Sequence, residues 1–269
     1  MKAISYCHPI SPEGRAEIVE APPWHYGADI LLVQFRADEA EVRRCLPPEL
    51  EVGEEPDLAF AWIADIVSVG ENGRDLLGTN PERTQYREGL IALSCKFGGV
   101  SGFFHPYVWV DQDFSLMRGW FLGFPKKLGK VYMTRIHRMN PLINSLMGSR
   151  LMGFVERHGN RIMTAELKIT EKVEDKILPK LGNTYNVRHF PDVGSTRPLL
   201  HDLVNVRAQN VRFGAVWRGD ADLAFGSSEN EEVARLGPEK IDVGYYYEVG
   251  WTNVGVDRVR DLLEQNSTA

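Results

Sequence analysis

Short apolar or alternating stretches, separated by turn-forming residues, recur along the middle of the chain. Segments of this length bounded by Gly, Asn or Asp are typical of strands, and a break such as His158-Gly159-Asn160-Arg161 is typical of a hairpin. The spacing therefore predicts a meandering antiparallel sheet rather than βαβ units. The stretches cover residues 89–97, 106–110, 114–122, 130–137, 151–157 and 161–169.

Further elements are expected on both sides of this region. Asp38 is placed to cap a short helix that continues to Cys45, and Pro47-Pro48 stops it. Near the end of the chain, Asp257 to Gln265 is expected to form a helix with Val259, Leu262 and Leu263 on one face. Additional strands are expected at residues 28–36, 58–67, 184–190, 202–217 and 241–252, and a polar loop at 71–84.

Together these elements predict a mainly β (α+β) fold. We expect a closed, strongly curved antiparallel β-barrel or double sheet with a few peripheral helices. The length of 269 residues and the lack of a low-complexity linker are consistent with one domain over residues 1–269.

The composition narrows the classes of function. The net charge is −6 and the 31 basic residues are scattered, which argues against nucleic-acid binding. Cys7, Cys45 and Cys95 form no CxxC pair and no histidines form an HxH or HxxxH pair, so we predict no disulfide framework, no metal and no cofactor. No apolar run is long enough to span a membrane, and we expect a cytoplasmic protein.

The Phe-Pro-Lys-Lys-Leu-Gly run at residues 124–129 is the strongest chemical signal. A lysine attacks carbonyl groups at neutral pH only if its charged form is destabilised, either by burial or by a neighbouring cation. The residues before Lys126 are strongly apolar and Lys127 is a cation, although on an extended segment the two side chains would point to opposite faces. Burial is therefore the larger expected effect. A solvated turn is the alternative interpretation of the pair.

This run, placed mid-chain after an apolar stretch, resembles the signature of the acetoacetate decarboxylase superfamily. The match extends over most of the chain, and the Pro-Lys-Lys-Leu-Gly part is its most specific element. Further segments similar to the family lie at residues 35–38, 46–52, 86–88, 183–187 and 190–192.

The resemblance implies a fold, an assembly and residue roles. It implies a barrel-like antiparallel fold and a homo-oligomer. Lys126 would form an imine with a carbonyl substrate, and Lys127 would help to depress the pKa of Lys126. Acetoacetate decarboxylase is a standard example of an enzyme that uses such a lysine. Glu88 would move protons near the imine, with a surface acid at a strand end as its alternative. On an extended segment, the spacing would also place Tyr86 on the face of Glu88, where its phenol could orient a substrate oxygen or donate a proton.

Several positions depart from the decarboxylase pattern. Ala28 and Ala61 occupy places where acetoacetate decarboxylases carry an arginine and a glutamate, and Trp120 replaces an acid. Related members that act on pyruvate-like acids carry an arginine eight residues before the lysine, which makes Arg118 the candidate carboxylate ligand; a salt bridge at the rim is its alternative. Leu122 stands where those members often carry a polar amide.

The aromatic segment at residues 244–251 adds two candidates. Alternation would place Tyr246 and Glu248 on one face, where they could contact substrate, and Tyr245 and Tyr247 on the other. Packing of aromatic residues within a strand is the alternative.

The sequence thus predicts a cofactor-independent lyase in which Lys126 forms a Schiff base with a small, pyruvate-like oxo acid. Aldol, retro-aldol and dehydration steps with an aldehyde partner follow from this intermediate. One alternative is decarboxylation of acetoacetate or another 3-oxo acid through the same imine. A second is a non-catalytic small-acid binding protein on this scaffold.

Overall fold

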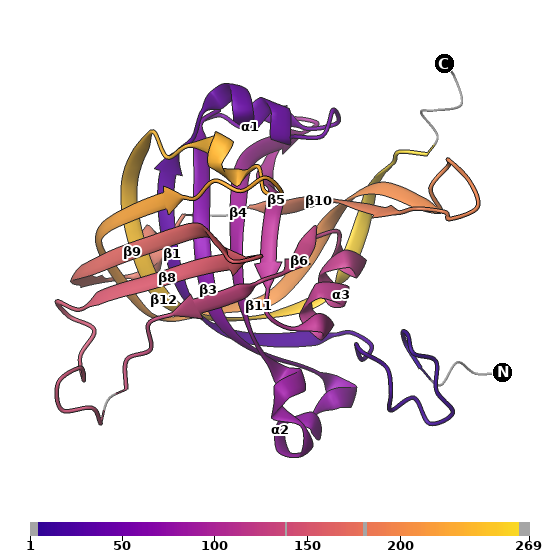
Figure 1. The fold of residues 1–269 in the computed structure, drawn as a ribbon, viewed down its shortest axis with the longest axis horizontal. Helices are drawn as coiled ribbons and strands as arrows, with labels where there is room; N and C mark the ends of the chain where they lie inside the picture. The colour runs from indigo at the N-terminus through magenta and orange to yellow at the C-terminus, as the bar shows by residue number, and fades with distance from the viewer. Residues whose placement is uncertain (1–4, 138, 180–181, 264–269) are drawn as a thin grey trace.

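The computed structural model describes residues 5–137, 139–179 and 182–263 (Figure 1). Its helices are α1 (Glu39–Cys45), α2 (Leu76–Thr79) and α3 (Asp113–Leu122). Its strands are β1 (Trp24–Arg36), β2 (Glu51–Val52), β3 (Leu58–Gly70), β4 (Gln85–Phe97), β5 (Val100–Val110), β6 (Lys126–Leu128), β7 (Lys130–Met133), β8 (Arg150–Arg157), β9 (Asn160–Val173), β10 (Asn183–Phe190), β11 (Leu200–Phe225) and β12 (Lys240–Asp261). The prediction of a mainly β fold with a few helices is confirmed.

Seven strands close into a ring. The hydrogen-bonded order is β10-β5-β4-β3-β1-β12-β11, and β10 also pairs with β11, which joins the two ends. Most neighbours are antiparallel, as expected, but β10 and β6 each pair with β5 in parallel. The ring is therefore a mixed sheet.

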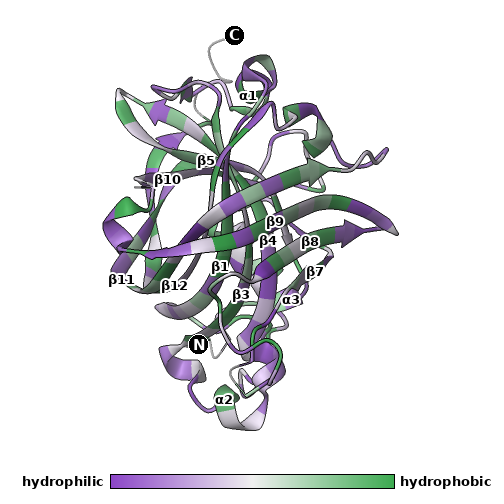
Figure 2. Cartoon of the chain, turned by 90° about the vertical axis from the view of Figure 1, so that its left-hand side faces the viewer, coloured by the Kyte–Doolittle hydropathy of each residue, from purple (hydrophilic) through white to green (hydrophobic). Residues whose placement is uncertain are grey.

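The remaining long strands form an outer layer. The second half of β11 leaves the ring and pairs with β9, and β8 and β7 follow in order. Figures 1 and 2 show β8 and β9 crossing over β1 and β3. The long strands β11 and β12 bend at several register shifts, so they can belong to both the ring and the outer layer.

The strand β1 is buried on both faces because it lies between the outer layer and the ring interior. Leu31 and Val33 contact the apolar cluster shared with the outer layer, whereas Ile30 and Leu32 belong to the cluster inside the ring. A strand buried on both faces carries a nearly continuous apolar run, which explains the composition of residues 28–36.

The stretch 114–122 is a helix and not a strand. Phe114, Arg118 and Leu122 are buried and recur every four residues, which is the spacing of one helical face. Helix α3 ends at Gly123, which adopts a left-handed conformation (φ 86°). A short apolar run does not distinguish a strand from a buried helix by composition, and this is why the strand prediction was wrong.

The helix expected at Asp257–Gln265 is also wrong for the part that the structure describes. Strand β12 continues to Asp261, and Arg258 and Arg260 pair with Val204 and Leu203 of β11. Pairing with a neighbouring strand overrides the weak helical pattern of this segment. Residues 264 and 265 lie outside the described residues.

No helix among the described residues is both long and apolar enough to cross a membrane. The short helix α1 begins as expected: the Asp38 side chain accepts a hydrogen bond of 3.0 Å from the backbone N–H of Glu41.

We expect Asp38→Ala to lower the free energy of unfolding by about 1 kcal/mol, because it leaves a backbone N–H of α1 without its acceptor. Asp38→Asn keeps an acceptor and should cost only a few tenths of a kcal/mol. Urea denaturation of the two variants measures the difference. Equal losses in the free energy of unfolding would show that the side-chain acceptor at residue 38 does not stabilise the helix.

Candidate active site

The turn between α3 and β6 positions Lys126. The backbone N–H of Phe124 donates to the carbonyl of Gly119 at 2.9 Å, and that of Gly123 donates to the carbonyl of Trp120 at 3.2 Å, which closes the end of α3. Pro125 cannot continue a helix, and the next residues form β6 alongside β5. Because side chains alternate along a strand, Lys126 and Lys127 point to opposite faces.

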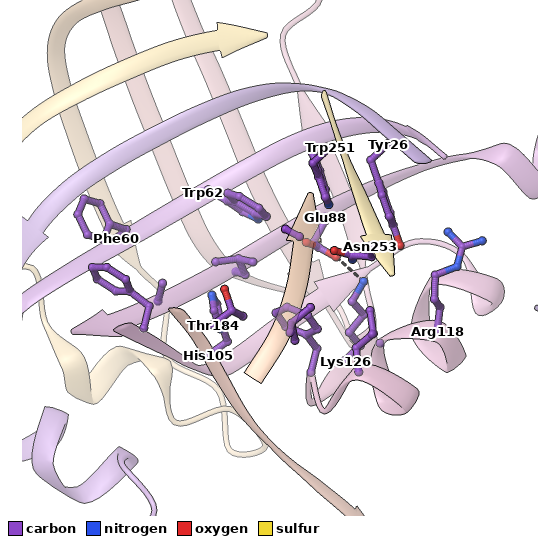
Figure 3. Close-up of a pocket in the computed structure, with 18 of the residues that line it drawn as sticks. Tyr26, Phe60, Trp62, Glu88, His105, Arg118, Lys126, Thr184, Trp251 and Asn253 are labelled. Carbon is purple, nitrogen blue, oxygen red and sulfur yellow. Dashed lines mark ion pairs between the residues drawn. The ribbon is translucent and has the colours of Figure 1, made fainter. Parts of the chain in front are cut away.

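Lys126 points into the interior of the ring. Its side chain is only 8% exposed, and its Nζ lies 2.6 Å from Oε2 of Glu88. It also donates a hydrogen bond of 3.0 Å to Oγ of Ser115 on α3. The rings of Tyr86 and Phe124 lie 5.3 and 5.9 Å from Nζ. The lysine is thus held between a carboxylate, a hydroxyl and two aromatic faces. Figure 3 shows its ion pair with Glu88.

A cavity of about 140 Å³ surrounds this pair, and we call it the lysine pocket. Strand β4 contributes alternate residues to its wall, among them Tyr86, Glu88 and Leu90. In Figure 3, Phe60 and Arg118 lie at opposite ends of the view, with Lys126 and Glu88 between them. The full lining is Tyr26, Leu32, Phe60, Trp62, Tyr86, Glu88, Leu90, Ala92, Phe103, His105, Arg118, Gly119, Leu122, Phe124, Lys126, Thr184, Val206, Ala208, Trp251 and Asn253.

Burial is the main cause that lowers the pKa of Lys126 below the ordinary value of a lysine. The carboxylate of Glu88 acts in the opposite direction and raises it, while the positive charge of Arg118 lowers it further. A lowered pKa increases the fraction of neutral amine at neutral pH, and only the neutral amine is a nucleophile. Glu88 is within reach to accept the proton that the ammonium gives up.

Lys127 does not enter the lysine pocket. Its Nζ lies 2.5 Å from Oε2 of the buried Glu231 and 5.8 Å from the ring of Trp109. The expectation that Lys127 depresses the pKa of Lys126 is therefore corrected, since Arg118 is the cation that acts on it. The physical reason is the alternation of side chains along β6.

Arg118 lies in the lysine pocket, although on a helix rather than on the extended segment that the sequence suggested. It is only 2% exposed, and its Nη2 pairs with Oε1 of the buried Glu20 at 3.0 Å. Its Nη1 donates to Oγ of Ser68 at 2.5 Å. The salt bridge is therefore internal and not at the rim, and Glu20 is a site residue that the sequence did not reveal.

Tyr86 lies in the pocket beside the lysine, and burial raises its pKa well above the ordinary value. Its phenol therefore stays protonated at neutral pH. The Tyr26 hydroxyl interacts with Arg118 and with Asn253, which lines the pocket from β12 (Figure 3).

Tyr246 and Glu248 are not brought to Lys126. Tyr246 packs against the cluster of the outer layer, and Glu248 is exposed. The placement of these two residues at the site is corrected: β12 presents Trp251 and Asn253 to the lysine pocket instead. Trp251 and Asn253 lie an even number of positions from Tyr245 and Tyr247, so all four side chains are expected on one face of the strand. Alternation thus identified two faces correctly, but the wrong face was assigned to the site.

His105 is a second residue that the sequence did not single out. It is buried on β5, and burial lowers its pKa to about 4, so the imidazole is neutral at physiological pH. Its Nδ1 lies 3.2 Å from Oδ1 of Asn186. Among the residues that the structure describes, no three His, Cys, Asp or Glu side chains converge on a possible metal position.

Comparison with known proteins agrees with this geometry. A model of the acetoacetate decarboxylase family matches residues 7–263. The chain belongs to the acetoacetate decarboxylase family. None of the curated proteins compared with it matches the sequence.

Solved structures of two enzymes share 30% or more of the sequence with this chain. The enduracididine biosynthesis enzyme MppR, in complex with the condensation product of pyruvate and imidazole 4-carboxaldehyde, is 31% identical, with 97% of this chain and 98% of MppR covered and a TM-score of 0.89. An acetoacetate decarboxylase-like enzyme from Sphingomonas wittichii RW1 is 30% identical, with 96% and 100% covered and a TM-score of 0.90.

Acetoacetate decarboxylase itself is more distant. The enzyme from Legionella pneumophila is 18% identical, with 91% of this chain and 90% of that chain covered and a TM-score of 0.77. The two proteins share the fold. The family and its enzyme members together make this protein an enzyme of the acetoacetate decarboxylase superfamily.

We expect the pKa of Lys126 to lie below the ordinary value of a lysine, because its ammonium is buried. Glu88→Gln should lower the pKa of Lys126 further, since the variant removes the charge that raises it. NMR titration of the lysine side-chain Cε signals measures both shifts. Glu248→Gln, at an exposed carboxylate, is the control and should change nothing. A Lys126 signal that titrates with the exposed lysines would contradict the expectation.

Proposed function

We propose that this protein is a cofactor-independent lyase in which Lys126 forms a Schiff base with a small 2-oxo acid such as pyruvate. One observation carries the proposal: an amine with a lowered pKa lies inside a small pocket, 2.6 Å from a carboxylate that can accept its proton. The protonated imine withdraws electrons from the adjacent carbon, so that an enamine forms and adds to an aldehyde. The reverse cleavage and the loss of water use the same intermediate.

Glu88 moves the protons in this scheme. The amine must lose a proton before it attacks, and the carbinolamine must lose water before the imine forms. Glu88 is close enough to Nζ to serve both steps, and Tyr86 supplies a protonated phenol on the same face of β4. Lys127 has no role in this scheme because its partner Glu231 lies outside the pocket.

Arg118 binds the substrate carboxylate in the proposal. A guanidinium has five N–H donors; Glu20, Ser68 and the Tyr26 hydroxyl each accept only one of them, and Nε has no partner among the described residues. Arg118 therefore has donors left for a second anion while Glu20 holds it in place. The surrounding rings of Trp24, Tyr26 and Phe114 lie 5.2, 5.7 and 5.3 Å from its central carbon and limit the movement of the side chain.

Decarboxylation of acetoacetate or another 3-oxo acid is the second candidate, because loss of carbon dioxide from the imine also leaves an enamine. The family match favours it in general terms. Two features favour the 2-oxo acid instead. MppR, which is 31% identical, was solved with pyruvate, whereas acetoacetate decarboxylase is only 18% identical.

Borohydride reduction in the presence of pyruvate should add the mass of the reduced pyruvate adduct to Lys126, because hydride fixes an imine as a stable amine. Lys126→Ala should abolish the adduct, and Lys127→Ala should retain it. Peptide mass spectrometry measures the three results.

The same assay with acetoacetate separates the alternatives. Rapid release of carbon dioxide from acetoacetate, without condensation of pyruvate and an aldehyde, would replace the aldolase proposal by the decarboxylase. Absence of any adduct with either acid would leave only a non-catalytic binding protein.

Gly119 lies directly behind the stem of Lys126. A Cβ added at this position would meet Cδ of Lys126 at 2.3 Å, so Gly119→Ala must displace the lysine. A misplacement of about 1 Å can reduce a rate by about 100-fold, and we expect the rate of pyruvate trapping to fall by about tenfold or more. Gly78→Ala is the matched control, because its Cβ meets no atom within 4 Å. Equal trapping rates in both variants would contradict this role of Gly119.

A further inference from the structure

A second cavity adjoins the lysine pocket. It encloses about 610 Å³, and we call it the outer cavity. Five residues line both cavities, which makes them the junction between the two: Leu32, Trp62, Thr184, Ala208 and Trp251. The outer cavity and the chamber that contains Lys126 therefore meet at these five side chains.

The outer cavity is apolar. Among the residues that the structure describes, its charged lining residues are Asp175 and Lys176, and both side chains are exposed. Phe213 meets Tyr247 edge to face, with 6.0 Å between the ring centroids. The further apolar lining includes Ile30, Leu178, Val211 and Val249. Such a wall favours an uncharged, apolar occupant, because a charged one would lose its hydration without gaining a partner.

The difference in size between the cavities restricts how two substrates fit. The lysine pocket, at about 140 Å³, has room for a small oxo acid attached to Lys126, whereas the outer cavity is more than four times larger. The aldehyde carbon must reach the enamine in the lysine pocket for a bond to form. A substituent too large for the lysine pocket would then extend past the junction residues towards the outer cavity.

We propose that the outer cavity binds the substituent of the second substrate, and that this substrate is an aldehyde with an aryl or similarly flat apolar group. The inference rests on the proposed function of Lys126 and specifies its partner. Flat groups suit the junction because two of its residues, Trp62 and Trp251, present indole rings.

Trp62 carries an unpaired polar group at the junction. Its indole Nε1 is buried and has no hydrogen-bond partner among the described residues. A buried donor without a partner is costly, and a small rotation of the indole towards an aldehyde oxygen in the junction would satisfy it. In the addition step the enamine carbon forms a bond to the aldehyde carbon, and the carbonyl π pair moves to the oxygen. That oxygen takes a proton to become a hydroxyl, and water then releases the 4-hydroxy-2-oxo acid from Lys126.

The test compares benzaldehyde with glycolaldehyde as partners of pyruvate. We expect kcat/KM to be at least about tenfold higher for benzaldehyde, which is within the range that an apolar pocket provides. Val211→Asp places a charge in the outer cavity and should lower kcat/KM for benzaldehyde by about tenfold, with a smaller effect on glycolaldehyde. Val100→Asp is the matched control, since the two valines are 53% and 54% exposed and Val100 lines neither cavity.

The outcome is separable from that of the proposed function. If pyruvate is trapped on Lys126 but benzaldehyde reacts no faster than glycolaldehyde, the proposed function stands and the inference fails. If no imine forms, binding of unreactive benzyl alcohol, followed by calorimetry, still tests the cavity. Benzyl alcohol should bind to the unmodified protein and to Val100→Asp but more weakly to Val211→Asp; no binding, or equal binding by all three, would overturn the inference.

Discussion

The contact between Lys126 and Glu88 inside the closed ring is the constraint on which the site depends. Both side chains are less than a tenth exposed, so their charges are removed from bulk water. Replacing a buried ion pair with apolar residues is often neutral or stabilising, whereas removing one partner commonly costs about 3–5 kcal/mol. The net stability gained from the pair therefore does not explain why it is buried. Its chemistry offers an explanation, because a buried amine beside a proton acceptor can become a nucleophile.

Closure of the ring makes this burial possible. Strand β10 pairs with β5 on one side and with β11 on the other, and without it the ring would be open between these two strands and its interior, where Glu88 of β4 lies, would be less enclosed. Helix α3 then lies close to β6. Ser115 accepts a hydrogen bond from the amine of Lys126, and Gly119 lies against its stem. The outer layer covers the opposite face of the sheet. The interior of the ring is therefore where the apolar side chains surround the polar groups of the site.

Much of this arrangement could be predicted from the sequence. Strand positions followed from apolar stretches and turns, and Lys126, Glu88, Tyr86 and Arg118 do meet in one pocket. The rest depended on information that a local pattern lacks. An apolar stretch did not reveal that α3 is helical, and alternation in β12 did not reveal which face points inward. Glu20, far from Arg118 in the sequence, meets it only because the chain folds back.

The electrostatic balance at Lys126 follows from how the nearby cations are paired. Lys127 is held by Glu231, which also pairs with Arg157, and Arg118 is held by Glu20. A cation next to a carboxylate exerts a weaker field at a third site, because the two opposite charges largely cancel at a distance. Repulsion between cations is therefore a minor cause of the lowered pKa, and burial is the main one. A substrate carboxylate that binds Arg118 would weaken the repulsion further, so the amine must be kept neutral by the apolar walls of the pocket.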